Sequence, residues 1–178
     1  LKVIVSGSTG GVGSLAVKLL SLMGAEVTAI TGKKDSDRYL YDLGSSKIIH
    51  RKEFLDSTRL PLSKGVYNAA VDAVGGNILS SMLASMQYNG IITACGNVAG
   101  ANFTTSVFPF ILRRNHLIGI DSATCPISIR EEIWNKFSKS WNLKDLGLIC
   151  KVIDLSSLDN EIKKILCGEQ VGRIIVQL

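Results

Sequence analysis

Four closely spaced glycines near the start of the chain have the spacing of an anion-binding turn. They are Gly7, Gly10, Gly11 and Gly13, within the sequence SGSTGGVG. Such glycines let the chain reverse sharply, approach a ligand closely and pack a new helix against the preceding strand. The free amide N–H groups and the partial positive charge at a helix start bind diphosphate groups. The pattern therefore indicates a dinucleotide site, and the alternative is a close-packed turn that binds nothing.

A second candidate site lies at the tip of the next predicted strand, at Thr31-Gly32-Lys33-Lys34. In a dinucleotide fold this tip meets the adenosine ribose, where an acidic residue binds a 2′-hydroxyl and a basic residue receives a 2′-phosphate. A hydroxyl, a glycine and two lysines favour the 2′-phosphate, and hence NADP over NAD. The alternative is that both lysines are solvated loop charges. Asp35 and Asp37 come later, where carboxylates complement the start of a helix.

Other polar residues have no single assignment. Asp72 ends a predicted strand, where it could bind a ribose or backbone amides, or cap the helix that follows. Arg113 and Arg114 could serve a phosphate or lie on the surface. Neither His50 nor His116 stands near a plausible nucleophile in the sequence, so we assign no catalytic residue.

The elements that must hold these residues alternate along the chain. Apolar runs predict strands over residues 3–5, 26–31, 47–50, 66–72 and 91–95, and helical spacing predicts helices over residues 12–23, 36–44 and 78–86. A turn is expected at Tyr88-Asn89-Gly90, and residues 51–65 form a helix or a loop. This order implies an α/β fold with a doubly wound parallel sheet, the Rossmann type of NAD(P)-binding domain.

The alternation changes after residue 101. Phe103, Phe108, Phe110 and Ile111 cluster around Pro109, which is typical of a lid over the reactive end of a cofactor or of a contact surface for a partner. A strand over residues 117–121 follows, and then a helix introduced by a capping box at residues 128–131. A strand over residues 148–155, a helix over residues 158–166 with an inward apolar face and an apolar strand over residues 173–178 complete the chain.

Length and composition are those of an ordinary globular protein. The 178 residues suffice for one domain with a real core, and 46% of them are hydrophobic and 20% charged. The net charge of +5 comes from scattered residues, which argues against a nucleic-acid partner and suits an anionic ligand. No apolar run approaches the roughly 20 residues of a membrane helix, and no leader is visible, so a cytoplasmic setting is expected. The four cysteines form no C-x-x-C pair, which predicts free thiols and no metal site.

Seven segments of the chain resemble the nicotinamide-binding domain of zinc-independent medium-chain dehydrogenase/reductases, namely SGSTGGVG, TGKK, VDAVGG, YNGIITACGN, FPFILRRN, LIGIDS and GRIIVQL. Over nearly its whole length the chain is similar to the acryloyl-CoA reductase and quinone oxidoreductase branch. FPFILR leading to GIDS is more particular to this branch than the glycine turn, which many dinucleotide folds share. The resemblance implies NADPH-dependent reduction of an activated C=C bond, in acryloyl-CoA or another enoyl thioester, or of a quinone.

Position by position, the resemblance implies a set of NADP(H)-binding residues. It assigns Thr9, Gly10, Gly11 and Val12 to the diphosphate, Thr31, Gly32 and Lys33 to the 2′-phosphate, Ala73 and Asn97 to the ribose and nicotinamide side, and Arg114 to a further polar contact. Lys33 replaces the arginine that often follows Ser-Gly in this family. Because lysine lacks the bidentate fork of arginine, discrimination of NADPH from NADH is expected to be weaker.

The chain is expected to be a piece of a longer polypeptide, because residue 1 is not methionine and the first strand follows at once. The resemblance implies that residues 1–178 are the dinucleotide-binding domain, without the N-terminal GroES-like catalytic domain toward which residues 168–178 lead back. Most of the substrate pocket and any proton donor then lie outside the chain, which alone would be inactive. The resemblance also implies a homodimer that forms through the edge strand near residues 117–121. The alternative is an NAD(P)-binding sensing or association module without catalysis.

Overall fold

In the computed structural model, which describes all 178 residues, a six-stranded sheet forms the centre of the molecule. Its strands are β1 (Lys2–Val5), β2 (Glu26–Thr31), β3 (Lys47–His50), β4 (Tyr67–Asp72), β5 (Met86–Ala94) and β6 (His116–Gly119). Their order across the sheet is β3-β2-β1-β4-β5-β6, and every neighbouring pair is parallel. The predicted doubly wound parallel sheet is confirmed.

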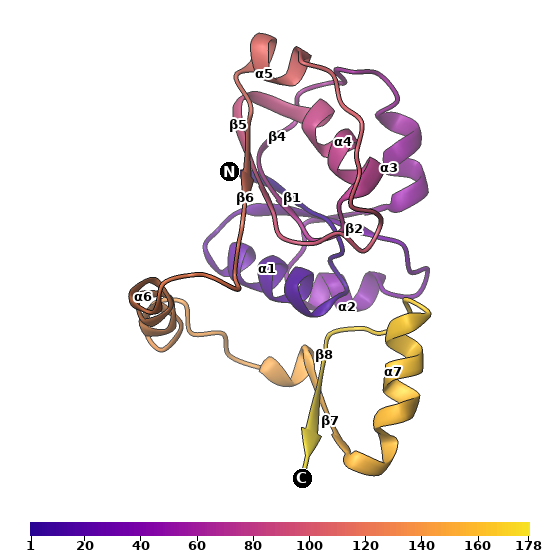
Figure 1. Ribbon diagram of the computed structural model, residues 1–178, viewed down its shortest axis with the longest axis vertical. Coiled ribbons are helices and arrows are strands. Elements are labelled where there is room, and N and C mark those ends of the chain that lie inside the picture. The colour runs from indigo at the N-terminus through magenta and orange to yellow at the C-terminus, as the bar shows by residue number, and fades with distance from the viewer.

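Helices cover both faces of this sheet (Figure 1). On one face lie α1 (Gly11–Leu22) and α2 (Asp37–Asp42), and on the other lie α3 (Arg51–Ser57) and α4 (Gly76–Ser85). Each helix buries an apolar stripe against the sheet, which gives two cores. One core contains Val17 of α1 and Leu40 of α2, and the other contains Phe54 of α3 and Met82 of α4. The polar segment after β3 is therefore helical at its start.

Because the strands are parallel, the loops that follow them gather at one edge of the sheet. The ends of β1, β2, β4 and β5 lead into the segments 6–10, 32–36, 73–75 and 95–107. The chain order reverses between β1 and β4, which are neighbours in the sheet. A crevice at such a reversal, beyond the carboxyl ends of the strands, is where open α/β sheets bind ligands.

The turn expected at Tyr88-Asn89-Gly90 is wrong, because these residues lie inside β5. Asn89 has a φ of 61°, and the pairing of β4 with β5 shifts register between Tyr67 and Ala69. One left-handed residue therefore makes an irregularity in a continuous strand. An Asn-Gly pair favours positive φ, and that local preference does not decide whether the chain reverses or continues.

The last part of the chain forms a small sheet of its own, which we call the C-terminal unit (residues 146–178). Strands β7 (Cys150–Asp154) and β8 (Arg173–Gln177) pair in parallel with each other and with no strand of the large sheet. The unit also contains α7 (Leu158–Leu166) and two short 3-10 helices, η1 (Leu146–Leu148) and η2 (Leu155–Ser157). Figure 1 shows it below α1 and α2, in yellow and orange. The expected final strand exists, but it extends this second sheet.

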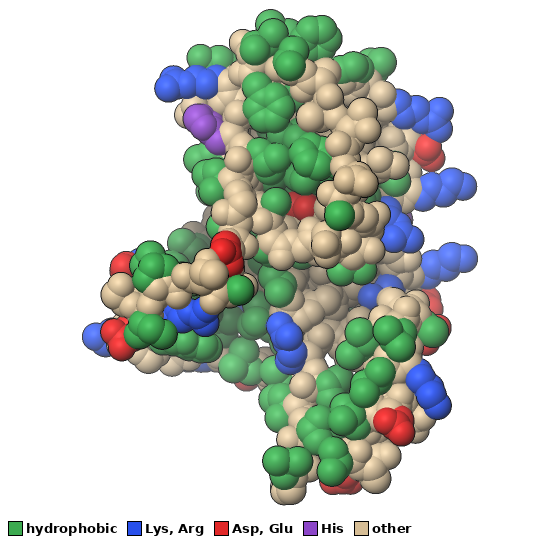
Figure 2. Space-filling model, viewed as in Figure 1, with side chains coloured by type: hydrophobic (Ala, Val, Ile, Leu, Met, Phe, Trp, Pro, Cys, Tyr) green, Lys and Arg blue, Asp and Glu red, His purple; other side chains and the backbone are tan.

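Two helices outside the α/β core have exposed apolar faces. Between β5 and the C-terminal unit lie α5 (Phe108–Arg113) and α6 (Ile127–Phe137), and α6 buries no residue. The capping box predicted at residues 128–131 is wrong, since α6 begins at Ile127, which places Ser128 inside its first turn, and no side chain caps it. The inward face predicted for α7 is also wrong, because Ile165 and Leu166 are 55% and 80% exposed. Figure 2 shows hydrophobic side chains gathered over the C-terminal unit.

None of the helices combines the length and the apolar composition that a membrane crossing requires.

Candidate functional site

A cavity of about 860 Å³ opens at the carboxyl edge of the large sheet, beside the reversal between β1 and β4. Its walls come from the glycine turn, the loops after β2, β4 and β5, and the C-terminal unit. The charged residues among its 27 lining residues are three cations, Lys33, Arg51 and Arg173, with no carboxylate. A positively charged cavity concentrates anions, so it suits a ligand that carries several phosphate groups.

The glycine turn and the start of α1 form one wall of the cavity. Gly7 has a φ of +58°, and a Cβ atom on Gly13 would stand 2.1 Å from the carbonyl oxygen of Gly7. The turn therefore packs this closely only because position 13 has no side chain. Gly10, which precedes the helix, provides no side-chain cap, and the first turn contains no acid. The first N–H groups of α1, and the positive end of its helix dipole, thus remain available to a ligand.

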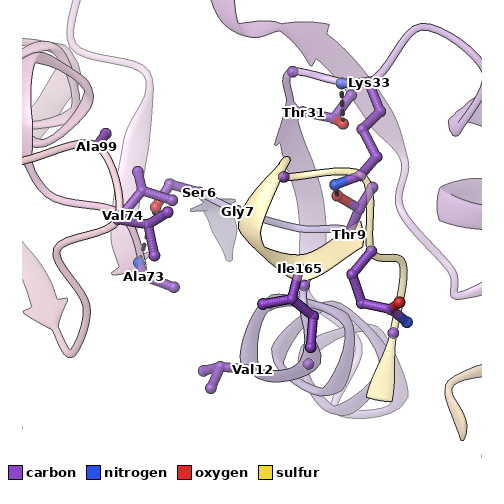
Figure 3. A pocket seen from close by; sticks show the side chains of 18 of the residues that line it. Ser6, Gly7, Thr9, Val12, Thr31, Lys33, Ala73, Val74, Ala99 and Ile165 are labelled. Carbon is purple, nitrogen blue, oxygen red and sulfur yellow. Dashed lines mark hydrogen bonds between the residues drawn. The ribbon is translucent and has the colours of Figure 1, made fainter. Parts of the chain in front are cut away.

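The side chain of Lys33 reaches back onto the glycine turn (Figure 3). Its Nζ donates a 3.0 Å hydrogen bond to Oγ1 of Thr9, and its backbone N–H donates to Oγ1 of Thr31 at 3.1 Å. The Thr31 hydroxyl also lies 3.1 Å from Oγ of Ser36. Burial, and next the charge of Arg51, hold the pKa of Lys33 below that of a free lysine. The ammonium group is thus a constrained cation between the tip of β2 and the start of α1.

Two arginines that the sequence analysis missed complete the positive lining. A Cβ atom on Gly32 would stand 3.2 Å from Cζ of Arg51, and one on Gly11 would stand 2.7 Å from Cζ of Arg173. Neither guanidinium takes part in an ion pair. Arg51 was detectable in principle, because it follows β3, the neighbour of β2. No local signal points to Arg173, which reaches the site from the last strand.

The C-terminal unit joins the cavity wall through its backbone. The N–H of Gly172 donates a 2.8 Å hydrogen bond to the carbonyl of Thr9, and Gly172 forms a parallel bridge with Gly10. Gly172 has a φ of +68°, and a Cβ atom there would stand 2.1 Å from the carbonyl oxygen of Ile149. These contacts fix the position from which Arg173 reaches over Gly11.

Asp72 binds backbone amides and does not line the cavity. Its fully buried carboxylate accepts hydrogen bonds from Oγ of Ser6 at 2.6 Å, from the N–H of Gly75 at 2.9 Å and from the N–H of Val74 at 3.3 Å. Ser6 in turn accepts from the N–H of Ala73 at 2.9 Å. Of the roles considered for Asp72, the structure supports the binding of backbone amides. It holds the loop after β4 in place.

Most of the predicted binding residues line this one cavity: Thr9, Gly10, Gly11, Val12, Thr31, Gly32, Lys33 and Ala73. Asn97 lies beside it, in a hollow of about 560 Å³ at the ends of β5 and β6. Cys95 lines both the cavity and this hollow, so the two are adjacent.

The structure does not bring Arg114 together with these residues. Arg114 follows α5 in a left-handed conformation, with a φ of 50°, and precedes the amino end of β6. The cavity lies at the opposite, carboxyl ends of the strands. The neighbouring Arg113 binds backbone instead of a phosphate, because its guanidinium donates to the carbonyls of Ala84 and Met86 at 2.9 and 2.8 Å.

The cysteines are free thiols, as predicted, and no three His, Cys, Asp or Glu side chains gather in the positions of metal ligands. Zinc independence of the protein as a whole stays a prediction.

Comparison with known sequences gives a consistent set of matches. A family model described as zinc-binding dehydrogenase matches residues 11–139. The chain is 38% identical over 177 residues to YhfP of Bacillus subtilis, provisionally named a quinone oxidoreductase, and 35% identical over 176 residues to the acrylyl-CoA reductase AcuI of Ruegeria pomeroyi. Each match covers 99% of this chain, but 54% and 53% of the relative. The chain thus spans about half the length of the curated relatives it matches.

Solved structures share the fold. Escherichia coli K-12 YhdH with bound NADPH has a TM-score of 0.92 and 37% identity, over 98% of this chain and 54% of that chain. Bacillus subtilis yhfP with bound NAD has a TM-score of 0.92 and 39% identity, over 99% of this chain and 54% of that chain. Both structures thus contain a region with the architecture described above.

Proposed function

Because the chain belongs to the zinc-binding dehydrogenase family, we propose that it is the NADP(H)-binding part of an oxidoreductase. The observation that carries this proposal is the cavity itself, which combines an uncapped helix start with three cations and no carboxylate. Two close structural neighbours were solved with NADPH or NAD bound, which supports a nicotinamide dinucleotide as the ligand.

The shape of the site fits an extended dinucleotide. Figure 3 shows Lys33 and Thr31 on one side of the glycine turn, and Ala73 and Val74 on the other. A diphosphate bound at the start of α1 would therefore have a cationic region on one side for the adenosine phosphate and an apolar region on the other for the nicotinamide. The guanidinium of Arg173, above Gly11, would lie over the diphosphate.

The proposed reaction is the reduction of an activated C=C bond, as in acryloyl-CoA or another enoyl thioester, or of a quinone. When bound, NADPH supplies the hydride. The residues of this chain would hold and orient the cofactor, and the apolar side chains of Val74 and Ile78 would exclude water from the cavity. The names of AcuI and YhfP support these two classes of acceptor.

We further propose that residues outside this chain complete the substrate pocket and supply the proton donor. The C-terminal unit exposes a group of apolar side chains, Val152, Leu155, Ile162, Ile165, Leu166, Ile175 and Leu178. Such a surface is costly to leave in water and calls for a partner. A catalytic domain in the rest of the polypeptide, toward which residues 168–178 lead, would cover it.

An assay of the intact polypeptide tests this function. NADPH oxidation should proceed with acryloyl-CoA or with a quinone and should be lost in Gly11→Asp. This variant places a carboxylate beside Arg173, and its Cβ atom meets only the movable end of that side chain. Gly147→Asp is the matched control, because nothing lies within 4 Å of a Cβ atom at that position.

Each outcome of this assay decides between functions. Binding of NADPH without oxidation by any activated alkene or quinone would favour a sensing or association module. Failure of the wild-type protein to bind either nicotinamide coenzyme would overturn the proposed function.

A further inference from the structure

We infer that Tyr39 is a positioning residue for the coenzyme diphosphate, and that it acts through the hydroxyl of Ser14 and the carbonyl of Ser8. The inference rests on the proposed binding of NADP(H). Tyr39 is not among the residues that line the cavity, so it would affect a ligand only through its neighbours.

The first observation is a pair of linked hydrogen bonds from α2 to the glycine turn. The phenolic O–H of Tyr39 donates to Oγ of Ser14 at 2.7 Å, and the Ser14 hydroxyl donates to the carbonyl of Ser8 at 3.2 Å. Because the serine hydroxyl accepts from Tyr39, its own single hydrogen is directed to Ser8. Linked hydroxyl groups of this kind polarise and strengthen each other.

The second observation is that these bonds are closed off from water where they meet the turn. Ser8 and Ser14 are both fully buried, and the bond from Ser14 is the one that the carbonyl of Ser8 receives. A buried carbonyl without a partner is costly, so loss of this bond would make the turn shift. Burial raises the pKa of Tyr39, and the phenol therefore keeps its hydrogen throughout the neutral pH range.

The third observation is the position of Ser8 in the turn. Thr9 and Gly10 follow it and lead directly into α1, whose first residues line the cavity and have no side-chain cap. The N–H of Ser14 donates to the carbonyl of Gly10 at 2.9 Å, so Ser14 contacts the turn at two points. Backbone amides bind an anion well only when they are held in place beforehand. A shift at Ser8 would therefore misplace the amides that a diphosphate needs.

The helix that carries Tyr39 is itself anchored. Its N-cap residue Ser36 lies 3.1 Å from Oγ1 of Thr31 and donates to the carbonyl of Lys33 at 3.1 Å. Beyond its other end, a Cβ atom on Gly44 would stand 2.2 Å from Oγ of Ser21 in α1, so the two helices approach closely. Figure 1 shows α1 and α2 on the same face of the sheet. The phenol is thus held from a fixed base.

The test is the dissociation constant of three ligands for the intact polypeptide and its variants. Tyr39→Phe should weaken NADPH and NADH by the same factor, about fivefold to tenfold, since both contain the diphosphate. Adenosine 2′-monophosphate, which has no diphosphate, should change by less than about twofold. Ser14→Ala breaks the same bonds from the other side and should have at least the effect of Tyr39→Phe.

A double variant and a control complete the design. Tyr39→Phe combined with Ser14→Ala should weaken NADPH no more than Ser14→Ala alone, because residues that act through one contact are not additive. Tyr41→Phe, on the same helix and 55% exposed, should change no ligand. Thermal unfolding verifies that each variant is folded under the conditions of the titration.

Several results would overturn the inference. Unchanged coenzyme binding in folded Tyr39→Phe would show that the phenol serves stability alone. An equal loss for adenosine 2′-monophosphate would show a general effect on the fold, and additive losses in the double variant would show that Tyr39 does not act through Ser14. Failure of the wild-type protein to bind either coenzyme would instead remove the proposed function itself.

Discussion

The hydroxyl of Ser6 donates a 2.6 Å hydrogen bond to Oδ1 of Asp72, and both residues are fully buried. Ser6 follows β1 and Asp72 ends β4, so the bond joins the two strands between which the chain order reverses. The loops that continue from these strands pack against each other in the cavity wall, where a Cβ atom on Gly7 would stand 2.9 Å from Cγ1 of Val74. A buried polar pair thus holds two loops of the site together.

We expect Asp72→Asn to lower the free energy of unfolding by about 2–3 kcal/mol, because an amide nitrogen would replace an oxygen that accepts from a hydroxyl or a backbone N–H. Ser6→Ala should cost less, about 1–2 kcal/mol, since it removes one hydroxyl from the network. Denaturant unfolding measures both losses. Asp154→Asn, at an exposed position, is the control. Losses no larger than that of the control would show that the network does not stabilise the fold.

The binding of both coenzymes should weaken at alkaline pH. Because burial and Arg51 lower the pKa of Lys33, its ammonium group loses its proton at a lower pH than a free lysine does. Affinity is therefore complete below the lowered pKa and declines as the pH rises through it. Calorimetric titration with NADPH and NADH between roughly pH 7 and pH 10 measures the decline. Lys33→Arg keeps its charge over this range, and a decline that persists in this variant would point to another titrating group.

Helix α7 should detach from β7 in acid. The buried carboxylate of Glu161 accepts hydrogen bonds from Nζ of Lys151 at 2.7 Å and from Nζ of Lys164 at 3.0 Å, and these bonds lower the pKa of Glu161. Its contribution to stability is fully present above the pKa of an unfolded glutamate and is lost as the pH falls through the lower folded pKa. Hydrogen exchange over residues 158–166 should accelerate in that range.

The variant Glu161→Gln should show the same faster exchange at neutral pH, where the wild-type protein is protected. Asp159→Asn, on the same helix and exposed, is the control. Exchange that is equally slow in Glu161→Gln would mean that apolar contacts alone hold α7 to β7.

A bound cofactor should protect the thiols that line the cavity from alkylation. Cys95 and Cys167 line the cavity, whereas Cys125 does not. Burial, and next the charge of Asp72, raise the pKa of Cys95, so less of the reactive thiolate forms and it should be alkylated more slowly than Cys167. Mass spectrometry after alkylation should show that NADPH slows the reaction of Cys167 and leaves that of Cys125 unchanged. Equal labelling of Cys167 with and without NADPH would place the ligand away from the C-terminal unit.

We expect the intact protein to form a homodimer through β6. This strand lies at the edge of the six-stranded sheet, and Ile118 and the adjacent Ile120 are 45% and 49% exposed. An unpaired edge with exposed apolar side chains favours pairing with another strand. Ile118→Lys should lower the dimer fraction in sedimentation measurements, and Leu60→Lys, on an exposed loop, should not. A monomeric wild-type protein would contradict this prediction.

The sequence predicts the sheet and the glycine turn because both depend on short-range patterns. Strands β2 and β3 have the predicted bounds, since apolar runs and flanking turn residues define them locally. The cations of the site are different. Lys33 follows a predicted strand directly, whereas Arg51 and Arg173 reach the site only through the register of β3 and the return of the last strand. Such contacts between distant segments leave no periodic signal.

The misplaced residues have a related cause. Arg114 is close in sequence to β6, but it precedes this strand, and only the carboxyl ends of the strands reach the cavity. The apolar stripe of α7 is correctly placed on the helix, yet periodicity describes a stripe and not what covers it. In this chain Leu158 and Ile165 line the cavity, and Ile162 and Leu166 are exposed.

The hydrogen bond from Gly172 to Thr9 ties the first loop of the chain to the strand that ends it. Because Arg173 follows at once, a rotation of the C-terminal unit would pull on the glycine turn and carry the guanidinium away from Gly11 in the same motion. This hydrogen bond thus couples the position of the C-terminal unit to the shape of the binding cavity. A partner that binds the C-terminal unit and rotates it would therefore change the rate of ligand release.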